Sequence, residues 1–165
     1  MASIYGFEIR NIKTFKGREW DGCQGSIYYK GKKVGWYNND GNGGCADIDF
    51  YFAGECRAEV EEALKTAVKE YFTRYPLGED YSQIIPDDEL FFAELIDLQD
   101  LEKRFKRYSK EGPTYLVSYT EVKSGFGKVA VSHGEDIFEI MRKALKDGVV
   151  NEVREYRSLS DFCIE

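Results

Sequence analysis

The sequence lacks most of the signals that assign a protein to a compartment. It has no apolar run of about 18 residues that would span a membrane, and no apolar segment near its start that resembles a signal peptide. Its four cysteines form no C-x-x-C pair, and their irregular spacing predicts reduced thiols, with neither disulfides nor a zinc site. These absences predict a cytoplasmic protein without a membrane segment, a metal or a cofactor.

Signatures of catalysis are also missing. The stretch GNGGCA at 41–46 has the letters of a dinucleotide-binding fingerprint, but that fingerprint must open a helix and this stretch precedes a strand. A calcium loop starting at Asp40 is excluded, because Cys45 and Tyr51 stand where glycine and glutamate are needed. His133 is the only histidine, and we interpret it as part of a helix cap. We therefore predict a non-enzymatic protein; a small enzyme using Cys45 or His133 is the third interpretation.

Enough apolar side chains are present for a packed core. The 165 residues are 42% hydrophobic and 15% aromatic, which argues against wholesale disorder. We predict a single α+β domain over residues 1–165, with a helical segment at about 55–111 between two strand-rich parts. The antiparallel sheet, packed against helices, should contain an N-terminal four-strand meander (4–15, 24–30, 33–39, 45–52) and a C-terminal ββαβ part (114–122, 127–131, a helix, 149–157).

The strand at 45–52 has the clearest alternation. Ala46, Ile48, Phe50 and Phe52 share one face, and two aspartates lie on the other. A slip of one residue would bury both aspartates, so the register is well specified.

Three helices are predicted in the middle of the chain. The first begins near Glu55 and must end before Pro76, because the residue that precedes a proline disfavours the α conformation. The second begins at Pro86. Asp97 or Asp100 would then cap a third, strongly basic helix.

The C-terminal third contains one more helix. Ser132 and Glu135 have the spacing of a capping box at its start. The expected core stripe of this helix is Ile137, Ile140, Met141, Ala144 and Leu145. From residue 45 onward the predicted order is that of a ferredoxin-like split βαβ unit, which would place strand 45–52 in one sheet with the C-terminal strands.

Acidic charge is concentrated in one segment. Residues 55–100 hold 4 basic and 13 acidic side chains, while the segments on either side each have a net charge of +1. In a helix, six carboxylates between Asp87 and Asp100 would follow one another at about one per 3.5 Å, close to the roughly 3.4 Å phosphate spacing of one DNA strand. We predict a partner-binding surface that mimics nucleic acid, formed by Asp87, Asp88, Glu89, Phe92, Glu94, Ile96, Asp97 and Asp100.

A basic segment follows directly and supports a second interpretation. Its side chains would contact phosphates if the protein were a nucleic-acid-binding accessory protein. They are Lys103, Arg104, Lys106, Arg107 and Lys110.

Two segments resemble a loose group of uncharacterised proteins encoded by phages and mobile elements of Gram-positive gut bacteria. One is 15–52, with KGRE, IYYKGKKVG and NDGxGGxxDIDF; the other is 95–117, with ELIDLQDLEKRFK and EGPTYLV. Some members of that group are anti-CRISPR proteins that inhibit Cas9. The resemblance implies a Cas9-type nuclease with its guide RNA as the partner, inside a bacterial host cell. It supplies no site residues.

The prediction from sequence is thus a non-enzymatic inhibitor that binds a protein partner. The second predicted helix also has apolar residues on two sides, so it must be covered within the fold or by a second copy in a homodimer.

Overall fold

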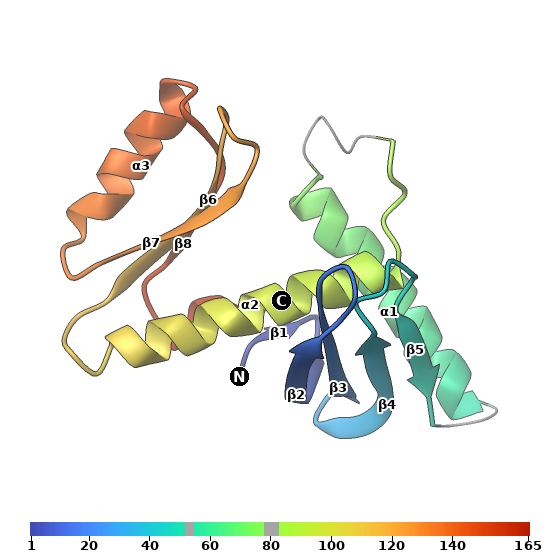
Figure 1. Cartoon of the computed structure of the whole chain (residues 1–165). Coiled ribbons are helices and arrows are strands. Elements are labelled where there is room, and N and C mark those ends of the chain that lie inside the picture. Colours follow the sequence, from blue (N-terminus) through green and yellow to red (C-terminus); the bar gives the residue numbers. More distant parts are fainter. Residues whose placement is uncertain (52–54, 78–82) are drawn as a thin grey trace. The chain divides into compact units, whose positions relative to one another are not determined.

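The structure is a computed structural model that describes residues 1–51, 55–77 and 83–165 (Figure 1). Phe52, Glu79 and Asp80, which the predicted strand and acidic segment include, lie outside these ranges. The described chain is α+β, with antiparallel sheets packed against helices, as predicted. It divides into two compact units: an N-terminal unit of residues 2–98 with 164–165, and a C-terminal unit of Met1 with 99–163. That residues 1–165 form one domain stays a prediction.

The N-terminal unit contains the predicted meander. Its strands are β1 (Ser3–Ile4), β2 (Phe7–Lys16), β3 (Asp21–Tyr29), β4 (Lys32–Asn39) and β5 (Asp47–Phe50), hydrogen-bonded in the order β5-β4-β3-β2-β1. The expected first strand is interrupted, because Tyr5 and Gly6 have φ angles of 47° and 80° and turn the chain between β1 and β2. A short β9 (Cys163–Ile164) pairs at the edge, where the Tyr5 N–H donates to the Ile164 carbonyl at 2.8 Å.

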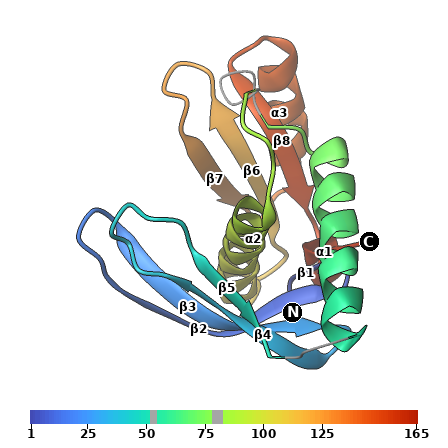
Figure 2. The same ribbon diagram turned by 90° about the vertical axis from the view of Figure 1, so that its right-hand side faces the viewer.

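Two helices cover one face of this sheet (Figure 2). They are α1 (Glu55–Arg74), which ends before Pro76 as predicted, and the first half of α2 (Asp88–Tyr108). Aromatic rings fill the layer between them: the Phe7 ring lies 5.8 Å from Phe91 and 6.3 Å from Phe92, centre to centre. The alternation in β5 is confirmed, because Phe50 is buried and the two aspartates of the strand are exposed.

Two loops of the N-terminal unit pack backbone against backbone. One joins β2 to β3 and carries Gly17, and the other joins β4 to β5 and carries Gly41; the Glu19 N–H donates to the Gly41 carbonyl at 2.9 Å. A Cβ added to Gly41 would lie 2.3 Å from the Trp20 carbonyl oxygen, and one added to Gly17 would lie 2.7 Å from the Gly41 Cα. Close packing therefore explains Gly17 of the KGRE motif and Gly41 of the NDGxGG motif, where no Cβ fits.

The C-terminal unit is a three-stranded antiparallel sheet with a helix on one face. Its strands β6 (Tyr115–Glu121), β7 (Gly127–Ser132) and β8 (Val150–Tyr156) lie in the order β7-β6-β8. Helix α3 (Asp136–Lys146) packs on them, and its buried side chains share a core with Val117 and Val150. The following 3₁₀ turn (Leu159–Phe162) buries Phe162 between the rings of Phe105 and Tyr156.

Four predictions about these elements were wrong. Strand β5 pairs with β4 and not with the C-terminal strands. The elements follow one another in the ferredoxin-like order, but they do not form a ferredoxin-like sheet. Helix α2 runs without a break through Asp97 and Asp100, because neither aspartate interrupts its hydrogen bonding. Ser132 is the last residue of β7, so it cannot cap α3. The residue at the helix N-cap position is Glu135, whose side chain makes no capping hydrogen bond.

The fourth correction is the buried face of α3. Ile137 and Met141 are buried as predicted, but Phe138 is 1% exposed while Ile140 and Leu145 are 59% and 44% exposed. The helix starts three residues later than the capping box predicts, and its phenylalanine ring faces the sheet. No helix in the described residues is long and apolar enough to cross a membrane.

Candidate functional site

Asp87 and Asp88 lie at the start of α2. Asp87 is exposed and caps the helix, because its Oδ1 accepts the Leu90 N–H at 3.0 Å and its carbonyl accepts the Phe91 N–H at 3.1 Å. Burial raises the pKa of the Asp88 carboxyl, and the neighbouring negative charge of Asp87 adds to this effect. Lys65 of α1 acts in the opposite direction.

Two of the predicted acidic residues have structural partners. The Ala46 N–H donates to Glu89 at 2.9 Å, and the Tyr71 hydroxyl donates to Glu94 at 2.6 Å. Because Tyr71 is buried, Glu94 supplies an acceptor that the core of this unit needs. Both glutamates therefore attach α2 to its neighbours within the N-terminal unit.

The prediction that Phe92 contacts a partner was wrong. The side chain is 0% exposed and packs against Phe7, Tyr37 and Phe91. Ile96 is partly buried. The apolar side chains on both sides of this half of α2 are thus covered inside the unit, so its sequence pattern requires no second copy. The homodimer stays a prediction.

The remaining acidic residues divide between the two units. Asp97 is exposed on α2 in the N-terminal unit, while Asp100 belongs to the C-terminal unit and pairs with Lys103 at 2.8 Å. Counted by unit, residues 2–98 with 164–165 hold 11 basic and 19 acidic side chains, a net charge of −8. The C-terminal unit holds 12 basic and 11 acidic ones, a net charge of +1.

The basic segment is only partly available for phosphates. Lys103 pairs with Asp100, and Lys106 binds the buried carboxylate of Glu102 at 2.7 Å, which the N-terminal ammonium also approaches at 3.4 Å. Within the described residues, Arg104, Arg107 and Lys110 have no carboxylate partner.

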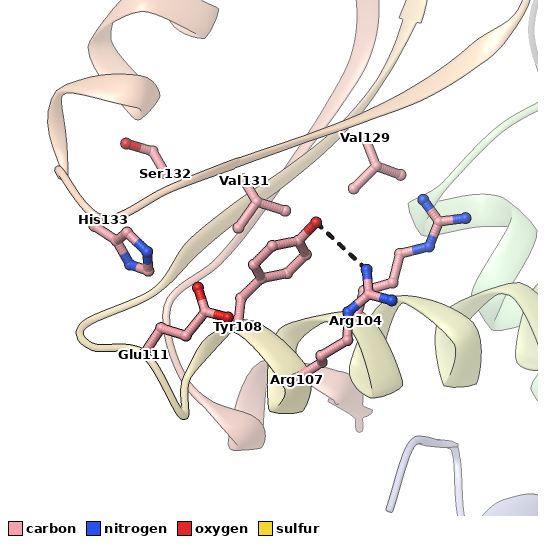
Figure 3. Close-up of a pocket in the computed structure, with 8 residues that line it drawn as sticks. All are labelled: Arg104, Arg107, Tyr108, Glu111, Val129, Val131, Ser132 and His133. Carbon is pink, nitrogen blue, oxygen red and sulfur yellow. Dashed lines mark hydrogen bonds between the residues drawn. The ribbon is translucent and has the colours of Figure 1, made fainter.

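Arg104 and Arg107 line a cavity of about 280 Å³ in the C-terminal unit (Figure 3). The end of α2, the segment after it and β7 form its walls. The lining residues are Arg104, Arg107, Tyr108, Glu111, Val129, Val131, Ser132 and His133.

His133 belongs to this cavity and not to a helix cap. Its Nδ1 lies 2.8 Å from the Pro113 carbonyl oxygen. Because a carbonyl only accepts, this contact assigns the proton to Nδ1 and leaves Nε2 for another partner. Ser132 Oγ accepts the Gly134 N–H at 2.9 Å, so the hydroxyl proton of Ser132 is still available to donate.

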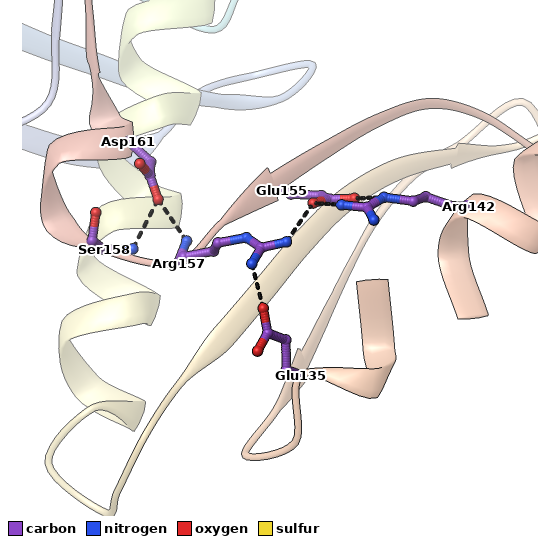
Figure 4. Close-up of polar contacts among 6 residues, drawn as sticks. All are labelled: Glu135, Arg142, Glu155, Arg157, Ser158 and Asp161. Atoms are coloured by element: carbon purple, nitrogen blue, oxygen red, sulfur yellow. Dashed lines mark hydrogen bonds and ion pairs between the residues drawn. The ribbon is translucent and has the colours of Figure 1, made fainter. Parts of the chain in front are cut away.

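A second polar cluster in the C-terminal unit is structural (Figure 4). Arg142 of α3 donates two hydrogen bonds of 2.6 Å to Glu155 of β8, and Arg157 contacts both Glu155 and Glu135. The hydrogen bonds from Arg142 hold the pKa of Glu155 below its ordinary value. Arg157 also lies over the Phe138 ring, 4.4 Å from its centre. The cluster attaches α3 to β8, and its charged side chains are hydrogen-bonded to one another.

Among the described residues, the cysteines belong to no cluster of potential metal ligands. Cys45 and Cys163 are exposed thiols, and Cys23 is partly buried. No three His, Cys, Asp or Glu residues of the described chain gather in a way that would hold a metal ion. Asp49 accepts a hydrogen bond from the Trp36 indole at 3.3 Å on the outer face of the N-terminal sheet.

Comparison of the chain with protein-family models, with curated proteins and with solved structures gives no match. The resemblance to phage and mobile-element proteins therefore stays a prediction.

Sequence reasoning named two residues of the cavity as phosphate contacts and missed the cavity itself. Two signals were present: arginines three residues apart share a helix face, and valines two residues apart share a strand face. Only the tertiary structure brings these faces together.

Proposed function

We propose that the protein is a non-enzymatic inhibitor that binds a bacterial defence nuclease of the Cas9 type, with its guide RNA, in the cytoplasm of a bacterial host. The proposed binding surface, here called the acidic surface, comprises Asp87, Asp88 and Asp97 of the N-terminal unit and would occupy a cationic channel that otherwise holds nucleic acid. One observation carries the proposal: the net charge of −8 is confined to this unit, with Asp87 and Asp97 exposed on one helix.

Local charge, rather than a phosphate-like spacing, supports the proposal. The exposed Asp87 and Asp97 are ten positions apart, about 15 Å along a helix, which is wider than the roughly 3.4 Å between phosphates of one DNA strand. Burial is the main cause of the raised pKa of Asp88. The charges of Asp87 and Glu61 add to it and Lys65 opposes it, and Glu61 is itself paired with Arg57 at 2.7 Å. Such a cluster attracts a cationic cleft over a Debye length of roughly 10 Å at 0.1 M salt.

The test removes charge without removing structure. The triple variant Asp87→Asn, Asp88→Asn, Asp97→Asn keeps the cap of α2, since asparagine caps as well as aspartate. Glu94 is left unchanged because it accepts the Tyr71 hydroxyl. We expect the variant to lose at least about tenfold in inhibition, which corresponds to about 1.4 kcal/mol of binding.

The matched control removes three charges from the C-terminal unit by Asp136→Asn, Glu139→Gln and Asp147→Asn. It should inhibit like the unaltered protein, because the proposal concerns a local surface and not net charge. Target DNA binding and DNA cleavage by a Cas9–guide RNA complex are measured separately, at two salt concentrations. Equal potency of the two variants would refute the acidic surface, and no inhibition by the unaltered protein would refute the target.

The same assays separate the two other interpretations. A nucleic-acid-binding accessory protein would itself bind DNA, with an affinity that falls steeply as salt rises. An enzyme would lose all activity on substitution of Cys45 or His133.

A further inference from the structure

We propose that the cavity of the C-terminal unit binds a small phosphorylated molecule with a flat ring, of the nucleoside monophosphate class. This inference is independent of the proposed inhibitor function, since none of the lining residues belongs to the acidic N-terminal unit.

The cationic end of the cavity fits a phosphate. Arg104 and Arg107 are one turn apart on α2, and neither has a carboxylate partner among the described residues, although Lys103 and Lys106 on the same helix do. Arg107 donates to the Tyr108 hydroxyl at 3.3 Å, which fixes its guanidinium beside the cavity and leaves its other N–H groups to donate. Two guanidinium groups without carboxylate partners match the charge of a phosphate and can donate hydrogen bonds to its tetrahedrally arranged oxygens.

The middle of the cavity fits a ring. The Tyr108 ring and Val131 stand between the arginines and His133 in Figure 3, with Val129 above the arginine end. Val129 and Val131 are alternate residues of β7 and are both partly buried, so they form an apolar wall on one side. A flat group here would contact valine methyl groups and an aromatic side chain, as bases do in many nucleotide sites.

The far end of the cavity offers hydrogen bonds and excludes a second phosphate. His133 Nε2 is available to a ligand, because the Pro113 carbonyl holds the Nδ1 side of the ring. Glu111 lies at the same end, and its carboxylate makes no ion pair within the described chain. Glu111 accepts hydrogen bonds from hydroxyl or amino groups but repels phosphate. The cavity therefore has a cationic end at the arginines and an anionic end at Glu111, and this difference orients the ligand.

The size of the cavity agrees with a single nucleotide. Its volume of about 280 Å³ lies just below the roughly 300–1,000 Å³ typical of small-molecule sites, so only a small ligand fits. A continuing nucleic-acid strand would place its next phosphate near Glu111. We therefore favour a mononucleotide over single-stranded nucleic acid.

The experiment is calorimetric titration of the full chain with the nucleoside 5′-monophosphates. Inorganic phosphate, the unphosphorylated nucleosides and a short single-stranded oligonucleotide are titrated in parallel. We expect at least one monophosphate to bind, with at least about tenfold weaker binding of both inorganic phosphate and the matching nucleoside. His133→Asn, which keeps the net charge near neutral pH, should weaken the binding further than it weakens the binding of phosphate alone.

The decisive comparison uses two double variants of equal charge. Arg104→Gln with Arg107→Gln removes the cationic end of the cavity, while Lys103→Gln with Lys110→Gln removes two charges of the same segment outside it. We expect at least about tenfold loss for the arginine pair and less than about twofold for the lysine pair. The proposal is overturned by no binding of any monophosphate, by equal losses in both variants, or by tighter binding of the oligonucleotide. Circular dichroism melts of each variant confirm that the fold is retained.

Discussion

Single glycines decide the structure of the loops at one end of the N-terminal sheet. Gly41 has a φ of 70° and touches the Trp20 carbonyl region so closely that no Cβ fits, whereas Gly44, three residues later in the same loop, has open space around it. The glycine-rich sequence alone does not distinguish these two positions. The structure does, because the neighbour of Gly41 comes from a different loop.

Gly41→Ala should therefore destabilise the protein, by about 2–4 kcal/mol from left-handed backbone strain and overpacking together. Gly44→Ala is the matched control and should change the free energy of unfolding by no more than about 0.5 kcal/mol. Urea unfolding followed by the fluorescence of Trp20 and Trp36 measures both. Equal effects of the two substitutions would contradict the close packing of the two loops.

Residue-level prediction succeeded where local pattern decides burial and failed where tertiary neighbours do. The alternation of β5 and the end of α1 before Pro76 follow from strand geometry and from proline sterics. The burial of Phe92 did not follow, because both Phe91 and Phe92 are covered and only the sheet beneath them determines this. The sequence also could not show that Arg104 and Arg107 lack carboxylate partners, because this depends on the pairing of the nearby carboxylates with Lys103 and Lys106.

At the level of elements, α3 shows that helical periodicity alone does not decide which side chains are buried. Ile140 and Leu145 belong to the predicted stripe, but the observed helix exposes both and buries Phe138. The network of Arg142, Glu155 and Arg157 attaches that helix to β8. The predicted stripe was thus an incomplete guide to the buried face, because the core also includes the Phe138 ring.

Phe138→Ala should destabilise the C-terminal unit by about 3–5 kcal/mol, because it leaves a cavity in the core and removes the ring beneath Arg157. Ile140→Ala, on the exposed side of the same helix, should cost no more than about 0.5 kcal/mol. Hydrogen exchange of the α3 and β8 amides measures both changes. A larger loss for Ile140→Ala would restore the stripe predicted from sequence.

The element order was predicted almost completely, while the grouping of strands into sheets was not. Local signals identify strands and helices, but the βαββαβ order after residue 45 is compatible with one sheet or with two. Pairing between β4 and β5 was already favoured by their short hairpin-like connection, and the structure keeps β5 in that sheet. Sequence order alone gave no reason to separate it from β6.

At the scale of the whole molecule, the two units should respond differently to pH. The pKa of Glu155 is held low by Arg142, so its contribution to the C-terminal unit is present above the ordinary value of 4.5 and is lost on acidification. The pKa of Asp88 is raised by burial, so protonation of this carboxyl at low pH stabilises the folded N-terminal unit. Burial also raises the pKa of Tyr37 from 10.0 to about 12, so the N-terminal unit loses stability between those values.

We expect hydrogen exchange to show the C-terminal unit loosening first as pH falls below about 4.5, with a contribution of about 0.5–1 kcal/mol from the Glu155 ion pairs. Above pH 10.0 the N-terminal unit should loosen first, by about 2 kcal/mol as Tyr37 ionises. Glu155→Gln should remove the first effect and Tyr37→Phe the second, with Tyr28→Phe as the control for the latter. Simultaneous loosening of both units in both ranges would contradict this assignment.

The continuous helix α2 has a practical consequence for dissection of the protein. It contributes residues 88–98 to one unit and 99–108 to the other. A fragment that ends at Leu98 or begins at Gln99 would carry only about three turns of α2 at its new terminus. Helices shorter than about 12–15 residues are marginal in water without their packing partners. Overlapping fragments that each keep all of α2 are therefore the rational choice for subcloning.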